Sequence, residues 1–139
     1  MVTLHIAQLL ANEGFGTLDT DIFWEDMPVD SEGNPKNGVW IVTRGTPVTR
    51  FTTTNQAFDI YSRYSNKVTS SKKLEDILDY LQEAYGEVCE LPTVPPHSMT
   101  RYYDARITPV SAIENVGSDE QDKVVRVISG EIKFKKESI

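Results

Sequence analysis

Cysteine and histidine are scarce in this sequence of 139 residues, which contains one Cys and two His. The single cysteine, Cys89, cannot form an intrachain disulfide and favours a reducing compartment, and these three side chains are too few and too far apart in sequence for a zinc site. No apolar run approaches the roughly 18 residues of a membrane-spanning helix. The N-terminus also lacks the basic and apolar regions of a signal peptide. We therefore expect no membrane association and a protein that works in the cytoplasm or in an assembly built there.

Basic residues are outnumbered, with 14 Lys and Arg against 21 Asp and Glu, so the net charge is −7. An acidic surface repels phosphate, and sequence-specific nucleic-acid binding is not expected. Lys133, Lys135 and Lys136 are interleaved with Ile132 and Phe134. This spacing is typical of a half-buried strand with its lysines turned outward.

Catalytic motifs are also missing. The sequence has no phosphate-binding GxxxxGK[ST] loop and no GxSxG, and Cys89 lies in the segment VCEL, where a cysteine is usually a small buried hydrophobic residue. The segment DTDIFWED brings together four carboxylates that suit a hard cation: Asp19, Asp21, Glu25 and Asp26. Strand geometry sends Asp19 and Asp21 to one face and Asp26 to the other, so solvated strand ends are the favoured interpretation. We expect no enzyme and no cofactor, with a carboxylate- or metal-dependent enzyme as an alternative.

The first half of the chain predicts one helix and three strands. Apolar residues at helical spacing predict a helix over residues 2–13, ended by glycines. Strands are expected over residues 21–27, 39–44 and 56–64, joined by polar loops as an antiparallel meander. The loop after residue 44 contains Pro47.

The second half predicts an amphipathic helix over residues 71–85, capped by Ser70 or Ser71, and a short strand over 88–91. Two arms, residues 105–116 and 123–135, then form a long C-terminal hairpin. The expected fold is one α+β domain over residues 1–139. It has a mixed, mainly antiparallel sheet flanked by the N-terminal helix and the central amphipathic helix.

Three segments carry a resemblance to a known family: GVWIVTRGTPVTRFTTTNQAFDIYSRY, KKLEDILDYLQEAYGEVCELP and YYDARITPVSAIENVGSDEQDKVVRVISGEIKF. Their order of strands, helix and hairpin resembles the tail-terminator and related minor-capsid (neck) proteins of tailed bacteriophages. The resemblance implies a virion protein, assembled in the host bacterial cytoplasm, that forms a six-membered ring. Such a ring caps the tail-tube protein, ends tube polymerisation and meets the head connector and other neck proteins. Tail-completion and head-closure proteins share much of the pattern and remain alternatives.

A ring needs a patch on one copy that meets a different patch on the next. The expected last strand, residues 123–135, carries apolar residues on both of its faces. Either a neighbouring copy or the domain's own helices therefore cover one of these faces. The candidate interface residues are Val124, Val125, Val127, Ile128, Tyr102 and Tyr103. The candidate residues for an acidic tip or lumen are Glu114, Asp119, Glu120 and Asp122. A further alternative is an adaptor that binds peptide along an exposed edge strand.

Overall fold

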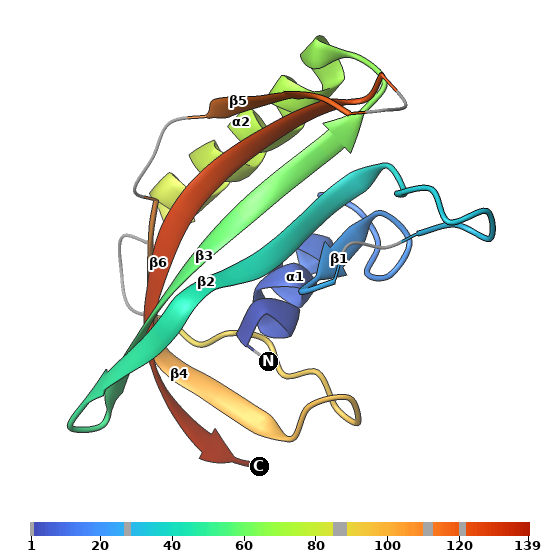
Figure 1. Cartoon of the computed structure of the whole chain (residues 1–139). Coiled ribbons are helices and arrows are strands. Elements are labelled where there is room, and N and C mark those ends of the chain that lie inside the picture. The colour runs from blue at the N-terminus through green and yellow to red at the C-terminus, as the bar shows by residue number, and fades with distance from the viewer. Residues whose placement is uncertain (1, 27–28, 85–88, 110–112, 120–121) are drawn as a thin grey trace.

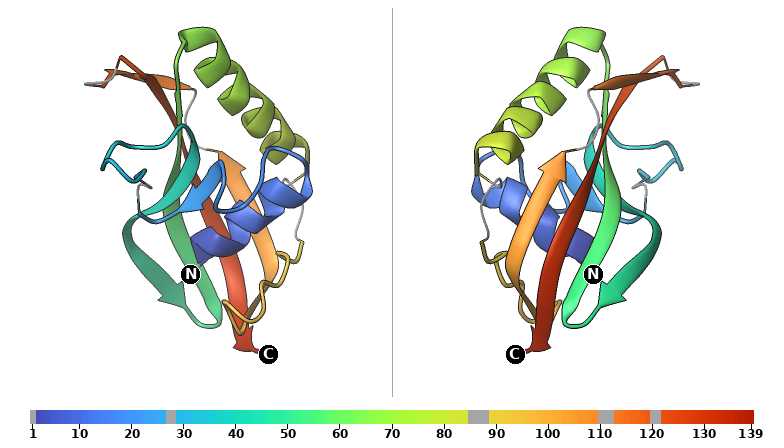
Figure 2. Two further views of the ribbon diagram at one scale, coloured as in Figure 1. Left: turned by 90° about the vertical axis from the view of Figure 1, so that its right-hand side faces the viewer. Right: turned by 90° about the vertical axis from the view of Figure 1, so that its left-hand side faces the viewer.

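The structure is a computed structural model that describes residues 2–26, 29–84, 89–109, 113–119 and 122–139. Within these ranges, two helices lie on one face of a curled, six-stranded sheet (Figures 1 and 2). The elements are α1 (Val2–Asn12), β1 (Ile22–Trp24), β2 (Gly38–Arg50), β3 (Thr53–Tyr64), α2 (Lys67–Ala84), β4 (Thr100–Pro109), β5 (Glu114–Ser118) and β6 (Val124–Ser138). The predicted α+β class is confirmed, since the sheet is mostly antiparallel and an N-terminal and a central helix flank it.

The sheet order is β1-β2-β3-β6-β4, and β5 also pairs with β6. The expected antiparallel meander of the first three strands is wrong at its start, because β1 pairs with β2 in parallel, with Ile22 opposite Val39. A parallel pair needs a connection of about a dozen residues to bring the chain back. The polar loop before Gly38 provides this length, so it is a return crossover and not a hairpin loop.

The C-terminal strand pairs antiparallel with both parts of the expected first arm, as predicted, but it also pairs with β3 and therefore lies inside the sheet. One edge of β6 pairs with β3, and the other edge pairs with β5 and then with β4. The expected first arm is therefore two separate strands. Since β3 and β4 are both antiparallel to β6, they are parallel to each other, and α2 connects them as a split β–α–β unit. Of the short strand expected at residues 88–91, Val88 lies outside the described residues and Cys89 forms a single bridge to Ala105.

Strand β2 continues six residues further than expected, to Arg50. A register shift between Arg44 and Val48 accommodates Pro47, which lacks a backbone donor but lies where the other edge of β2 has no strand neighbour in the described chain. Beyond this bulge, β2 and β3 form a ribbon that diverges from β4 and β6 and ends at the lower left of Figure 1. We call residues 44–55 the arm.

The end of α1 and the start of α2 are each determined by local hydrogen bonds. At the end of α1, the Gly14 backbone is left-handed (φ 86°), and the Phe15 N–H donates to the Leu10 carbonyl at 3.0 Å, which gives the helix a Schellman-type end. Helix α2 begins four residues earlier than expected, because the Asn66 side chain accepts the Thr69 N–H at 2.8 Å. The expected cap Ser70 is instead buried.

The main core lies between the sheet and the two helices. Alternate residues of β3 point into it, including Phe58 and Ile60, and α2 contributes Leu74 and Ile77. We call the opposite side of the sheet the outer face. Neither helix in the described part of the chain is long and apolar enough to cross a membrane.

One histidine belongs to this core. His5 on α1 is fully buried, and its Nδ1 lies 2.8 Å from the Pro92 carbonyl oxygen. A carbonyl only accepts, so Nδ1 carries the proton and Nε2 accepts from the Ser98 hydroxyl at 2.8 Å. Burial lowers the pKa of His5 below its ordinary value of 6.5. The ring is therefore a neutral structural group that fixes the loop before β4.

Candidate functional site

The clustered carboxylates of residues 19–26 are used by the backbone around them. The Asp21 carboxylate accepts the Thr17 N–H at 2.6 Å. Glu25 accepts the Thr3 hydroxyl at 2.8 Å and the Thr43 N–H at 3.2 Å, so it caps the open edge of β2 where β1 ends. No group of three or more His, Cys, Asp and Glu among the described residues is placed to hold a metal ion. These contacts account for Asp21 and Glu25 without a ligand.

The predicted interface residues divide between the core and the surface. Ile128 and Tyr102 are 2% and 5% exposed in the main core, and Tyr102 packs edge-on against Phe134. Their side chains are covered within one chain, which leaves little surface for a neighbour. Val124, Val125 and Tyr103 are half-buried, so the interface prediction stays open for these three.

Val127 is covered from the outer face. It lies opposite Tyr61 in the ladder, and the Tyr61 ring stacks on Trp40 at 5.0 Å between centroids and 11° between planes. Trp40 in turn lies opposite Phe23 of β1. This cross-strand row explains why Val127 is only 9% exposed without a second copy. The apolar residues of both phases in β6 are thus largely covered by the chain itself.

The structure supports only part of the predicted acidic tip. Asp119 is not a free tip residue, because its carboxylate forms an ion pair with the guanidinium of Arg63. Glu120 lies outside the described residues. Glu114 and Asp122 are exposed, and a role in an acidic lumen stays a prediction for these two.

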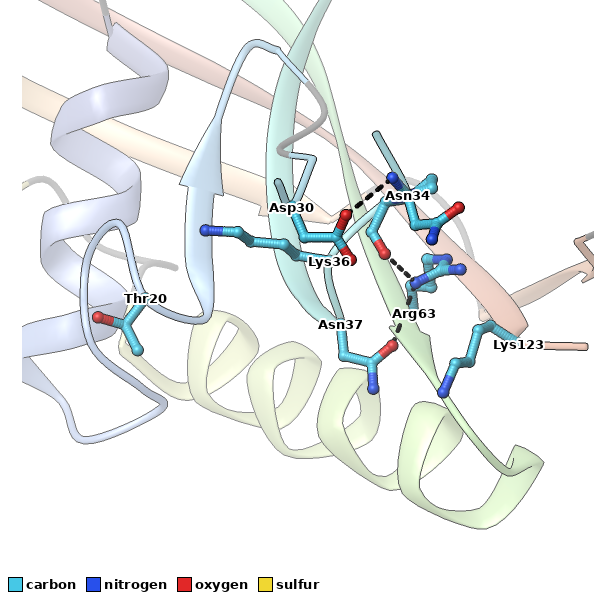
Figure 3. Close-up of a pocket in the computed structure, with 8 residues that line it drawn as sticks. Thr20, Asp30, Asn34, Lys36, Asn37, Arg63 and Lys123 are labelled. Atoms are coloured by element: carbon cyan, nitrogen blue, oxygen red, sulfur yellow. Dashed lines mark hydrogen bonds between the residues drawn. The ribbon is translucent and has the colours of Figure 1, made fainter. Parts of the chain in front are cut away.

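Arg63 is the largest fully buried side chain on the outer face, at 2% exposure. Besides Asp119, its guanidinium donates to the Pro35 carbonyl at 2.6 Å and to the Asn37 side-chain oxygen at 3.1 Å (Figure 3). One cation thus joins β3 to the loop before β2 and to the turn between β5 and β6. The hollow around it, about 590 Å³, is also lined by Lys123. We interpret this cluster as a structural clamp, since the charge of Arg63 is already neutralised.

The arm is a long exposed ribbon of the described chain. All eight residues of β2 from Thr43 to Arg50 are exposed, and Phe51 at the tip is fully exposed (102%). The Phe51 backbone is left-handed (φ 57°) at the first position of a two-residue turn, where glycine or asparagine is the usual choice. A bulky residue there costs backbone strain and leaves an aromatic ring in water. Neither cost is offset within one chain, so Phe51 is the strongest candidate for contact with a partner.

Sequence reasoning missed Phe51 and Arg63. A signal for Phe51 was present in RFTTT, where an aromatic residue interrupts a polar turn between two strands. Arg63 had no local signal, because its partners come from residues 35, 37 and 119.

No protein-family model matches the chain, and a search of curated proteins finds no match.

Proposed function

We propose that this chain is a structural subunit of a tailed-bacteriophage virion that assembles into a ring at the end of the tail tube. The ring would cap the tube, end its polymerisation and present a surface to the head connector. Two lines support this proposal: the resemblance of the three segments, and the α+β fold with a sheet flanked by an N-terminal and a central helix that the resemblance implies. No catalytic step is assigned to the chain.

The observation that carries an assembly role is the exposed, strained Phe51 at the tip of the arm. A projecting apolar tip meets a different patch on the next copy, and such a heterologous contact closes into a ring when the rotation permits. Burying a Phe side chain at an interface contributes about 2 kcal/mol per contact. A ring repeats this contact at every subunit boundary.

An adaptor that binds peptide along the β2 edge is a second candidate, because β2 has no strand neighbour beyond Ile41 in the described chain. Pro47 and the bulge interrupt the row of backbone donors that an added strand would need. We therefore favour contact through side chains of the arm. The adaptor predicts a monomer that binds an extended peptide one-to-one.

The test is native mass spectrometry over a range of protein concentrations, with negative-stain images of any large species, for wild type and Phe51→Gly. Wild type is expected to form a discrete ring with a central hole. Phe51→Gly should lose the ring while the monomer keeps or gains stability, by up to about 2 kcal/mol, because glycine relieves the left-handed strain. This separates a lost contact from a lost fold.

Val68→Ser is the matched control, since Val68 is a 70% exposed apolar residue on α2, far from the arm in sequence. It should assemble as wild type does. If Phe51→Gly also assembles normally, the arm is not the contact. If wild type stays monomeric both alone and with purified tail tubes, the ring proposal is wrong.

A further inference from the structure

Three cations gather on the outer face of the sheet next to the arm, although they are far apart in sequence. In the ladders, Arg106 of β4 lies opposite Lys133 of β6, and Lys133 lies opposite Asn55 of β3. Arg50 lies opposite Thr53 in the neighbouring row. All three cations are exposed, and none makes an ion pair or a side-chain hydrogen bond within the described residues. We call Arg50, Lys133 and Arg106 the basic stripe.

Neighbouring cations on the same face are paired within the chain. The Arg44 Nε atom lies 3.2 Å from Asp59 Oδ1, and the Lys135 Nζ atom lies 3.3 Å from Asp104 Oδ2. On a chain with a net charge of −7, three adjacent cations without an acidic partner stand out as an unmatched positive surface.

A hollow of about 340 Å³ opens in the stripe, lined by Val48, Arg50, Thr53, Asn55 and Lys133. The Oδ1 atom of Asn55 is buried there and has no hydrogen-bond partner in the described chain. Leaving such an atom unpaired is unfavourable, so a polar group from outside would stabilise the site. The hollow is therefore an incomplete polar site flanked by positive charge.

The matching negative surface lies in the same chain. The first 35 residues contain none of the 14 Lys and Arg but seven of the 21 acidic residues, so residues 36–139 carry 14 of each sign. The net charge of the whole protein thus resides in this segment. We call its acidic residues the acidic edge: Glu13, Asp19, Asp21, Glu25, Asp26, Asp30 and Glu32.

The two surfaces lie at opposite ends of the molecule. Strand β1 and the turns around it are at the right of Figure 1, whereas the arm, whose Asn55 pairs with Lys133, is at the lower left. Thr20 and Asp30 line one hollow, so the turn before β1 and the loop after it are neighbours, and Lys36 and Lys123 also line this hollow (Figure 3). One copy therefore cannot satisfy its stripe with its own edge, but a row of copies can.

We infer that the acidic edge of one copy binds the basic stripe of the next, as the head-to-tail contact of the ring. This inference rests on the proposed function and names the surfaces that meet. Opposite charges fix the direction of the contact, because stripe against stripe and edge against edge both repel. Arg50 lies in the arm next to Phe51, and Lys133 pairs with Asn55 at the base of the arm, so Phe51 and the stripe belong to one contact surface.

The test uses two full-length variants that reverse one surface each. The stripe variant carries Arg106→Glu and Lys133→Glu. The edge variant carries Glu13→Lys, Asp26→Lys and Glu32→Lys, whose carboxylates make no hydrogen bond or ion pair in the described chain. Self-association is measured by sedimentation velocity and native mass spectrometry at low and high salt.

Each variant alone is expected to self-associate at least about tenfold more weakly than wild type. Mixing the two should restore assembly in alternating order, because every boundary then joins opposite charges. Wild-type association should weaken as salt rises from about 0.05 M to about 0.5 M. Circular dichroism confirms that the variants are folded. Lys67→Glu with Lys73→Glu on α2 is the control for the stripe variant, because both change two cations to glutamate.

Wild type that assembles regardless of salt, with variants that assemble as well, overturns this contact but leaves the ring. Loss of assembly in both variants without rescue on mixing also overturns it. Salt-sensitive binding of duplex DNA by wild type that the stripe variant alone loses would instead assign the stripe to phosphate. Wild type that never assembles, alone or on tail tubes, removes the proposed function itself.

Discussion

Replacing Asp119 by Asn should lower the free energy of unfolding more than replacing Arg63, whose buried positive charge Asp119 neutralises. Asparagine keeps an oxygen that accepts the Lys123 N–H, now 3.0 Å from the Asp119 carboxylate, so the turn is preserved and only the charge is lost. Arg63 would then remain 2% exposed as a cation held by the neutral oxygens of Pro35 and Asn37.

The size of the effect follows from burial. Breaking a buried ion pair at one partner costs about 3–5 kcal/mol. The Asp119 side chain is 26% exposed, so water reaches its site and the cost should lie near about 2–3 kcal/mol. Arg63→Met removes the charge but keeps an apolar stem in place. The oxygens left behind are partly solvated, and about 1–2 kcal/mol is expected.

The assay is urea unfolding followed by tryptophan fluorescence, with both single variants and the double variant in one cycle. The double variant should be more stable than Asp119→Asn alone, since it no longer buries the Arg63 cation after its ion pair with Asp119 has been removed. Glu114→Gln, an exposed carboxylate on the same hairpin, should stay within about 0.5 kcal/mol of wild type. Additive losses, or a larger loss in Arg63→Met than in Asp119→Asn, would refute this account of the clamp.

Three further predictions concern single groups in the core and at a helix end. Because burial lowers the pKa of His5 below 6.5, the unfolded chain binds more protons just below that pH, and the free energy of unfolding should fall as pH decreases through 6.5 towards the folded pKa. His5→Gln should flatten this dependence in acid titrations. Gly130→Ala should cost about 1–3 kcal/mol in chemical unfolding, because its Cβ would lie 2.9 Å from the Phe58 ring, and Phe58→Leu in the same chain should recover part of the loss. Gly14→Ala should cost about 1–2 kcal/mol in thermal unfolding through its left-handed backbone alone, as a Cβ there meets no other atom within 4 Å.

The spacing of apolar residues was sufficient to predict an element's core-facing side where only one face of that element is buried. The amphipathic helix expected over residues 71–85 does turn its apolar side to the core, and the strand expected over residues 56–64 alternates into the core through Phe58 and Ile60. The limits of β2 were missed because Pro47 normally ends a strand, and only the open edge seen in three dimensions permits it. The parallel pairing of β1 and β2 was missed because the composition of a polar loop is the same in a hairpin turn and in a crossover between parallel strands.

The basic stripe and the Arg63–Asp119 ion pair depend on contacts between distant strands, which no local sequence pattern encodes. Arg106 and Lys133 come together through a ladder between strands that are distant in sequence, so the charges looked scattered along the chain. The reverse held for Asp119, which looked like part of an acidic tip until Arg63 was found against it. Charge runs predict exposure well, but they do not predict which charges fold onto one another.

The central position of β6 also bears on how the chain is made. Strands β3 and β4 each present an unpaired edge until residues 124–138 have been translated, because β6 is the strand that both of them pair with. Translation therefore leaves a nascent chain with helices and open strand edges, a state prone to wrong pairing between chains. The basic stripe forms only with the last strand of the sheet, because Lys133 lies in β6. For the proposed ring, the same delay would keep incomplete chains from associating. A stalled or shortened chain would lack that surface, so on the proposed contact it would be excluded from the ring.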